Sequence, residues 1–258
     1  LPESTIEEDI SLYGLQNNSQ YIHIKSLPKK GVYISKDVAD KYNLKVIYDA
    51  AHAFGVTYKG KGIGNYGDAS IFSFHATKVF NTIEGGAVTF SDHKMYEKLY
   101  NLKNFGIRGE ELVTSVGANA KMNEFCAIMG LCNLKHLDEA LKNRQERYDY
   151  YRQGLEKVKG ISFFATNTEA TNNFAYFPII IEDDYGITRD EIYDKFHESN
   201  IYARKYFYPI TADQACFRNK YKNNKLDVAR YISQRVLILP FYEKMQIGTI
   251  DTIIQILR

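Results

Sequence analysis

The stretch Leu44-Lys-Val-Ile-Tyr-Asp49 decides the fold class. Its β-branched and aromatic residues predict a short buried strand that ends at Asp49. A helical pattern, Ser35-Lys-Asp-Val-Ala-Asp-Lys-Tyr42, comes directly before it, with Ser35 as the predicted N-cap. A helix followed at once by a buried strand is half of an α/β unit, so the sequence predicts an α/β protein.

Further strands and helices follow along the chain. After a glycine-rich stretch at 55–67, the patterns predict strands at 69–74 and 85–90 and a helix at 91–103. A helical tract is predicted from 122 to about 159, with an apolar stripe at helical spacing that includes Phe125 and Leu134. Cys126 and Cys132 fall in this tract, where we expect them to be small buried residues.

The pattern changes after Gly160. We predict strands at 161–164, 174–181 and 201–204, and helices at 188–198, 227–235 and 249–257. Thr188 and Glu191 have the spacing of a capping box. The change of pattern places a domain boundary near residue 145, which separates residues 1–145 from residues 146–258. The opening residues predict a helix at 6–13 and a strand at 21–24.

Composition excludes several classes of function. The chain has 258 residues, and 33 Lys and Arg residues against 31 Asp and Glu residues give a net charge of +2. A dedicated binder of nucleic acid or of an anionic membrane needs concentrated positive charge, so we expect neither partner. The longest apolar runs are far shorter than the ~20 residues of a membrane helix, and no apolar signal-peptide core opens the chain, so a cytoplasmic location is expected. The three cysteines form no C-x-x-C pair and predict no metal site.

Polar residues fall at the ends of the predicted strands. Asp49 ends the first strand, Ser73 lies near the end of the second with Lys78 shortly after it, and Glu84-Gly-Gly86 opens the third. Ligands of α/β sheets gather beyond the carboxyl ends of strands. A lysine amine can form a Schiff base with a carbonyl, an aspartate can pair with a protonated pyridine nitrogen, and a hydroxyl with backbone donors can hold a phosphate. Together these groups describe a pyridoxal phosphate site.

Each of these residues also has an ordinary structural interpretation. A lone lysine is usually a solvated surface residue, and an aspartate at a strand end is usually a turn or cap residue. His52 alone is more often a structural histidine than a functional one. It is the order and the spacing of the whole set that favour the site.

The motifs resemble the DegT/DnrJ/EryC1/StrS sugar aminotransferases. The resemblance runs from about Asp37 to the C-terminus. It is carried by Asp49-Ala-Ala-His-Ala-Phe-Gly55, Tyr58-Lys-Gly-Lys-Gly-Ile-Gly64, Ser73-Phe-His-Ala-Thr-Lys78, Glu84-Gly-Gly-Ala87 and Gly117-Ala-Asn-Ala-Lys-Met-Asn-Glu124. It implies the pyridoxal-phosphate-dependent aspartate aminotransferase fold (fold type I). On this basis residues 1–145 are expected to form part of the large cofactor domain, with a mixed sheet, and residues 146–258 a small α+β domain.

The resemblance also implies roles for individual residues. Lys78 matches the lysine that holds the cofactor covalently and later moves a proton between the cofactor and the sugar. Asp49 matches the partner of the pyridinium nitrogen, His52 a position near the cofactor ring, and Ser73 a phosphate ligand. Asn119 matches an asparagine that reaches the phosphate from a neighbouring subunit, which implies a homodimer with shared active sites.

The resemblance further suggests a substrate. Related dehydratases carry histidine at the lysine position, so Lys78 favours transamination. The sequence from Phe74 to Gly86 is similar to that of enzymes that aminate C4 of dTDP-4-dehydro-6-deoxy-D-glucose. These enzymes use glutamate as the amino donor and give dTDP-4-amino-4,6-dideoxy-D-glucose. Arg204 and Tyr208 are candidate contacts to the nucleotide diphosphate or the sugar. Their alternative interpretation is a strand and turn with aromatic packing.

Two alternatives remain open at this point. Family chains are longer and begin with a phosphate-binding segment that residues 1–36 do not match, so we expect this chain to be a truncated form. A catalytically inactive homologue that acts as a structural or partner subunit is therefore one alternative. An aminotransferase acting at another sugar carbon is the other.

Overall fold

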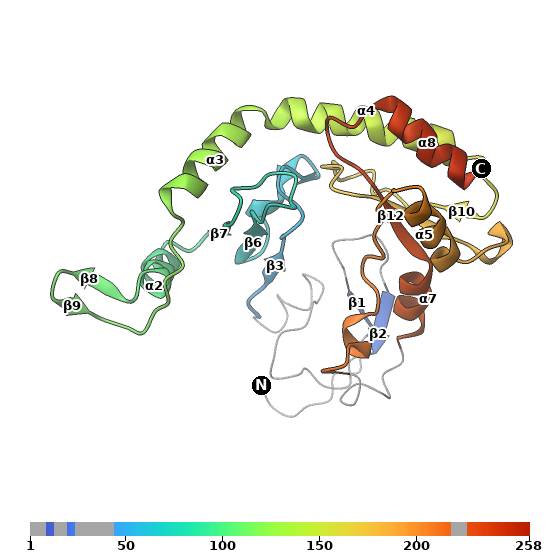
Figure 1. Cartoon of the computed structure of the whole chain (residues 1–258). Helices are drawn as coiled ribbons and strands as arrows, with labels where there is room; N and C mark the ends of the chain where they lie inside the picture. Colours follow the sequence, from blue (N-terminus) through green and yellow to red (C-terminus); the bar gives the residue numbers. More distant parts are fainter. Residues whose placement is uncertain (1–8, 13–19, 24–43, 218–225) are drawn as a thin grey trace. The chain divides into compact units, whose positions relative to one another are not determined.

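The computed structural model describes residues 9–12, 20–23, 44–217 and 226–258 (Figure 1). The chain divides into two compact units. Unit 1 contains Leu1–His136 and Thr166–Asn173, and unit 2 contains Leu137–Ala165 and Phe174–Arg258. The boundary predicted near residue 145 falls inside helix α4 (Leu137–Leu155), and the assignment of residues 1–145 and 146–258 to two domains stays a prediction.

A mixed three-stranded sheet forms the centre of unit 1. It contains β3 (Ile47–Asp49), β6 (Ala69–Ser73) and β7 (Gly86–Phe90), in the order β3-β6-β7. β3 runs parallel to β6, and β7 runs antiparallel to β6. The three strands predicted in this region are therefore confirmed. The helix predicted at 35–42 lies outside the described residues.

Burial of the first strand differs from the expectation. Ile47 in β3 is 54% exposed, and Ile71 in the middle of β6 is 46% exposed. Ser70 and Phe72, the neighbours of Ile71 in β6, point to the opposite face of the sheet and are buried. One face of the sheet is therefore covered within unit 1, and the other face carries exposed apolar side chains in the part of the chain that the structure describes.

A glycine allows the chain to enter β6 close to β3. Gly67 has φ +70°, and a Cβ atom there would lie 2.8 Å from the carbonyl oxygen of Val46. Next to it, the Asp68 carboxylate accepts a hydrogen bond of 2.8 Å from the Val46 amide. Between β3 and β6 lie β4 (Thr57–Tyr58), β5 (Lys61–Gly62) and the short helix η1 (Ile63–Asn65).

The rest of unit 1 consists of short strands and two helices. It contains β1 (Asp9–Leu12), β2 (Gln20–His23), α2 (Lys94–Lys103), β8 (Ile107–Gly109), β9 (Leu112–Val113) and α3 (Glu124–Lys135). β1 pairs antiparallel with β2, so the helix predicted at 6–13 is wrong over residues 9–12. The strand predicted at 21–24 is confirmed over residues 21–23.

The helical tract predicted from 122 to 159 is two helices. α3 ends at Lys135, the backbone N–H of its C-cap His136 bonds back to Asn133 and Leu134, and α4 begins directly afterwards. Only Cys126 and Gly130 of α3 are buried. Its apolar stripe is exposed, with Phe125 at 83%, and Cys132 is exposed as well, against the expectation.

Unit 2 is built around a three-stranded antiparallel sheet. The sheet contains β10 (Ile161–Ser162), β11 (Phe177–Ile181) and β12 (Val236–Leu239), in that order. The helices are α4, α5 (Arg189–Glu198), α7 (Asp227–Arg235) and α8 (Ile247–Leu257), with the short helices η2 (Asp183–Tyr185) and η3 (Thr211–Asp213). The capping box of Thr188 and Glu191 is present at the start of α5, as predicted.

The core of unit 2 lies between its sheet and its helices. α8 lies along α4 (Figure 1), and the Tyr150 hydroxyl donates a hydrogen bond of 2.7 Å to Asp251 between them. Tyr151 and Phe177, both fully buried, stack with ring centroids 4.7 Å apart. The strand predicted at 201–204 is reduced to a single bridge between Arg204 and Ile238. Among the described residues of either unit, no helix is long and apolar enough to cross a membrane.

Candidate active site

Lys78 and His52 lie side by side in unit 1. The Lys78 amine nitrogen Nζ is 3.1 Å from Nε2 and 3.5 Å from Nδ1 of the His52 ring. His52 lies in the loop that follows β3, and Lys78 in the turn that follows β6, where its backbone N–H bonds to the His75 carbonyl. β3 and β6 are adjacent and parallel, so their carboxyl ends bring these two loops together.

Asp49 and Ser73 lie at the ends of the same two strands. Asp49 is paired in register with Ile71, and side chains alternate along a strand, so Asp49, Ile71 and Ser73 share one face of the sheet. The Asp49 carboxylate accepts a hydrogen bond of 3.1 Å from the Ala51 N–H, and the Ser73 hydroxyl accepts one of 3.4 Å from the His75 N–H. These bonds tie both oxygen groups to the loops that follow their strands.

Glycine stands opposite Ser73. Gly86 begins β7 in register with Ser73, and a Cβ atom there would lie 2.7 Å from the Phe72 carbonyl oxygen. Glycine therefore permits the close pairing of β6 and β7 at this end of the sheet. It also leaves the sheet without a side chain beside the Ser73 hydroxyl.

The charges of Lys78 and Asp49 both act on His52. Partial burial lowers the pKa of the His52 ring below its ordinary value, and the neighbouring Lys78 cation lowers it further. The Asp49 carboxylate opposes this shift with a smaller effect. His52 is therefore a neutral imidazole at neutral pH, and one of its ring nitrogens can accept a hydrogen bond from the Lys78 amine.

Asn119 lies in a different part of unit 1. It follows the β8–β9 hairpin, where its backbone forms a bridge with Asn104. Its side-chain oxygen accepts a hydrogen bond of 3.0 Å from Lys121. Asn119 is exposed, and its bridge and its side-chain hydrogen bond are to Asn104 and Lys121.

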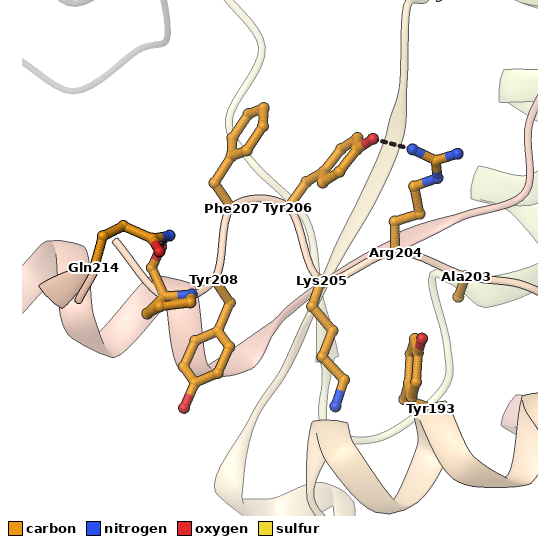
Figure 2. A pocket seen from close by; sticks show the side chains of 9 residues that line it. Tyr193, Ala203, Arg204, Lys205, Tyr206, Phe207, Tyr208 and Gln214 are labelled. Carbon is orange, nitrogen blue, oxygen red and sulfur yellow. Dashed lines mark hydrogen bonds between the residues drawn. The ribbon is translucent and has the colours of Figure 1, made fainter. Parts of the chain in front are cut away.

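Arg204 and Tyr208 line a pocket in unit 2. The pocket has a volume of about 340 Å³ and is lined by residues from the 203–209 segment with Tyr193 and Gln214 (Figure 2). The Arg204 guanidinium donates a hydrogen bond to the Tyr206 hydroxyl. The ring of Tyr208 lies over the buried Arg189, with the guanidinium carbon 4.9 Å from the ring centroid. Two cations, those of Arg204 and Lys205, and several aromatic faces therefore border this pocket.

The structure thus brings together some of the predicted residues and not others. Asp49, His52, Ser73 and Lys78 lie at one end of the unit 1 sheet, whereas Asn119 is in a separate segment and Arg204 and Tyr208 belong to unit 2. In the described part of the chain, no group of three or more His, Cys, Asp and Glu residues could hold a metal ion.

Sequence reasoning missed Asn173. Its side-chain amide donates hydrogen bonds of 2.7 Å to the His52 carbonyl and 3.0 Å to the Phe54 carbonyl. Asn173 follows His52 by 121 residues, and no local pattern of residues signals a contact over that separation.

Comparison with known proteins identifies the family. The profile of the DegT/DnrJ/EryC1/StrS aminotransferase family matches residues 33–258, and the chain belongs to this family. The chain is 42% identical over 222 residues to dTDP-4-amino-4,6-dideoxy-D-glucose transaminase of Shigella dysenteriae, and this match covers 86% of the chain and 60% of that protein. It is 38% identical over 226 residues to the Escherichia coli transaminase of the same name, with the same coverage of 86% and 60%. The chain therefore spans about 60% of the length of these relatives.

A solved structure gives the same result. The crystal structure of DesI in the presence of its TDP-sugar product matches with a TM-score of 0.79 and 31% identity, over 86% of this chain and 57% of that one. The predicted fold class, that of the pyridoxal-phosphate-dependent fold-type I aminotransferases, is confirmed by such structures. The family is one of pyridoxal-phosphate-dependent aminotransferases.

Proposed function

We propose that this chain acts in transamination of a nucleotide-linked keto sugar. The substrate of the proposed reaction is dTDP-4-dehydro-6-deoxy-D-glucose, the amino donor is glutamate, and the product is dTDP-4-amino-4,6-dideoxy-D-glucose. The observation that carries the proposal is the pairing of Lys78 with His52 beside the charge of Asp49, in a chain of an aminotransferase family. The names of the two transaminase relatives and the TDP-sugar product of DesI support the choice of substrate.

The residues at the end of the unit 1 sheet fit pyridoxal phosphate. The amine of Lys78 suits its aldehyde, the carboxylate of Asp49 suits a protonated pyridine nitrogen, and the hydroxyl of Ser73 suits its phosphate. The charges of Lys78 and Asp49 reach the same imidazole ring, which supports their action on one bound group. When bound, pyridoxal phosphate supplies an electron sink for the amino group transfer.

Each residue of this set has a distinct task in the proposal. The amine of Lys78 must be neutral to attack a carbonyl, and a neutral His52 ring can hold it in place through the hydrogen bond to Nε2. The Nζ atom of Lys78 would then carry a proton between a carbon of the cofactor and a carbon of the sugar. Asp49 would hold a proton on the pyridine nitrogen of the bound cofactor, and its bond from the Ala51 N–H fixes the direction of its carboxylate.

The pocket of unit 2 suits the nucleotide part of the substrate. A guanidinium binds phosphate oxygens with charge-assisted hydrogen bonds, which favours Arg204 for the diphosphate. The exposed rings of Tyr208 and Phe207 offer flat apolar faces with room for a base or a sugar. We expect Arg204→Met to raise the KM for the nucleotide sugar more than it lowers kcat, as loss of ground-state binding does.

The proposal extends to domains, assembly and location. Unit 1 takes the role of the cofactor-binding part and unit 2 the role of the small domain. Two copies form a homodimer in which Asn119 of one copy reaches the phosphate site of the other. We also propose that the protein works in the cytoplasm and has neither a membrane nor a nucleic acid as a partner.

The test measures cofactor attachment at Lys78. The purified chain is titrated with pyridoxal phosphate, and we expect a visible absorption band that Lys78→Ala abolishes. Reduction with borohydride and peptide mass spectrometry should place the label on Lys78. Lys98→Ala, which removes an exposed lysine of α2, is the matched control and should leave the band unchanged.

Two results would lead to other conclusions. A folded chain without any band at saturating pyridoxal phosphate would reject the enzyme assignment in favour of a non-catalytic partner subunit. A band together with a product aminated at another sugar carbon, as read by NMR of the product, would retain the transaminase and reject the C4 assignment.

A further inference from the structure

The segment Thr166–Asn173 is part of unit 1, although the chain on either side of it belongs to unit 2. It is joined to β4 by backbone and side-chain hydrogen bonds. The Thr171 N–H bonds to the Thr57 carbonyl at 2.9 Å, and the Thr57 N–H bonds to the Thr171 hydroxyl at 2.8 Å. The Lys59 N–H bonds to the Glu169 carbonyl at 2.7 Å. These contacts place the end of the segment, Asn173, beside the loop that follows β3.

Asn173 is a buried polar residue with a defined task in this loop. It is 6% exposed, and its amide nitrogen donates to the carbonyl oxygens of His52 and Phe54 at 2.7 and 3.0 Å. One amide group therefore holds two backbone positions on either side of Ala53. Each bond gives a backbone carbonyl of the loop a hydrogen-bond partner, so the two bonds together hold the path of the loop.

The loop is also held at its two ends. At its start, the Ala50 N–H bonds to the Ile71 carbonyl at 2.9 Å, and Ala50 is fully buried. At its far end, the Phe54 ring stacks on Phe80 with centroids 4.3 Å apart. Between these two anchors, Asn173 binds the backbone carbonyl of His52, the residue whose ring contacts Lys78.

We infer that Asn173 is a positioning residue, whose amide fixes the His52 backbone so that the His52 ring stays within hydrogen-bonding distance of the Lys78 amine. This inference rests on the proposed transamination for its functional meaning. Asn173 acts through His52 and does not itself touch the groups that react. A displacement of about 1 Å in such a supporting shell is enough to lower a rate by orders of magnitude.

The first test reads the His52 ring in the absence of cofactor and substrate. In chains labelled with ¹⁵N-histidine, the His52 signals are identified by their loss in His52→Gln. We expect Asn173→Ala to move the His52 titration toward that of an ordinary histidine. A displaced ring loses the partial burial and the nearby Lys78 cation that together lower its pKa, and the opposing effect of Asp49 is smaller. Asn173→Ser keeps one hydrogen-bond donor and should give a smaller shift.

The matched control is Thr171→Val. Thr171 lies in the same segment and accepts a hydrogen bond from Thr57 in β4, a contact that valine cannot make. Valine keeps the bond from the Thr171 N–H to the Thr57 carbonyl, and both Asn173 bonds to the His52 loop remain, so the segment keeps its place. We expect its His52 titration to equal that of the wild type.

The second test separates a positioning role from a purely structural one. In the loaded enzyme, Asn173→Ala should lower kcat roughly tenfold or more. In the His52→Gln background, the same change should have little further effect, because Asn173 acts through the ring that is already absent. Losses that multiply independently would contradict the inference.

The outcomes distinguish this inference from the proposed function. An unchanged His52 titration in folded Asn173→Ala overturns the inference, whatever the activity of the chain. Unfolding of both Asn173 variants with a folded Thr171→Val also overturns it, because Asn173 would then serve stability. A shifted His52 titration in a chain that binds no pyridoxal phosphate would support the positioning of His52 and reject the transaminase.

Discussion

The Lys78 amine lies 3.1 Å from the His52 ring nitrogen Nε2, although 26 residues separate them in the chain. This contact depends on the parallel pairing of β3 with β6, since parallel neighbours place their carboxyl ends on the same edge of the sheet. The Asp49 carboxylate at the end of β3 acts on the same ring.

Removal of His52 should change the pH dependence of stability. The pKa of His52 is lowered in the folded chain, so the fold favours the neutral ring. This contribution is complete above the pKa of an unfolded histidine and is lost as the pH falls through the lower, folded value. We therefore expect the wild type to lose stability relative to His52→Gln between pH 7.5 and pH 5, as measured by urea unfolding. His93→Gln, at an exposed position before α2, serves as control. Parallel pH profiles of wild type and His52→Gln would contradict the prediction.

Asp49→Asn should separate cofactor attachment from catalysis. The amide keeps the shape of the carboxylate but loses the charge that holds a proton on a pyridine nitrogen. Loss of such an electrostatic group costs roughly 10²–10³ in kcat, so we expect a fall of that size while the absorption band at Lys78 persists. Asp92→Asn, at an exposed turn before α2, should retain the wild-type rate. A kcat within about twofold of wild type for Asp49→Asn would remove Asp49 from the site.

Mixed dimers test the proposed role of Asn119. Lys78→Ala and Asn119→Ala should each be impaired alone. If Asn119 serves the site of the other copy, a mixed dimer contains one intact site, and random mixing restores about a quarter of the wild-type activity by the symmetry of a two-fold dimer. The rate is measured after the two variants are mixed and allowed to exchange subunits. Mixing without any gain, in a preparation that contains mixed dimers, would assign Asn119 to its own chain.

Arg189 should be a stability determinant of unit 2. It is 3% exposed, and its guanidinium donates to the carbonyls of Ser233 and Val236, both at 3.0 Å, and to Asp190 at 2.7 Å. Arg189→Met leaves the buried carbonyls of Ser233 and Val236 without their donor, so we expect a loss of about 2–4 kcal/mol in the free energy of unfolding.

The measurement for Arg189 is urea unfolding followed by far-UV circular dichroism. Lys195→Met, at an exposed position of the same helix, is the control and should change stability by less than about 0.5 kcal/mol. The ring of Tyr208 lies over Arg189, so Arg189→Met should also weaken binding of the nucleotide sugar. Equal stabilities for the two variants would show that the buried guanidinium contributes nothing.

Local sequence signals predicted much of the fold. The strands β6 and β7 and the capped start of α5 were predicted because alternation, turn glycines and the pair of Thr188 with Glu191 act within a few residues. The division of the tract at 122–159 had no such signal, because α3 ends at Lys135, with His136 as its C-cap, without a glycine or a proline. The exposure of Ile47 and Phe125 was missed as well, since apolar character alone does not say which surfaces are covered.

The sequence by itself determined the chemical identity of the candidate site: an amine at residue 78, a carboxylate at 49, an imidazole at 52 and a hydroxyl at 73, each near a strand end. Only the tertiary structure decided that the Lys78 amine meets the His52 ring and that Asn173 holds the loop after β3. It also decided that Arg204 and Tyr208 share one pocket. The physical reason is the range of the interactions. Turn and strand preferences act along the chain, whereas these contacts depend on strand pairing and on hydrogen bonds between distant segments.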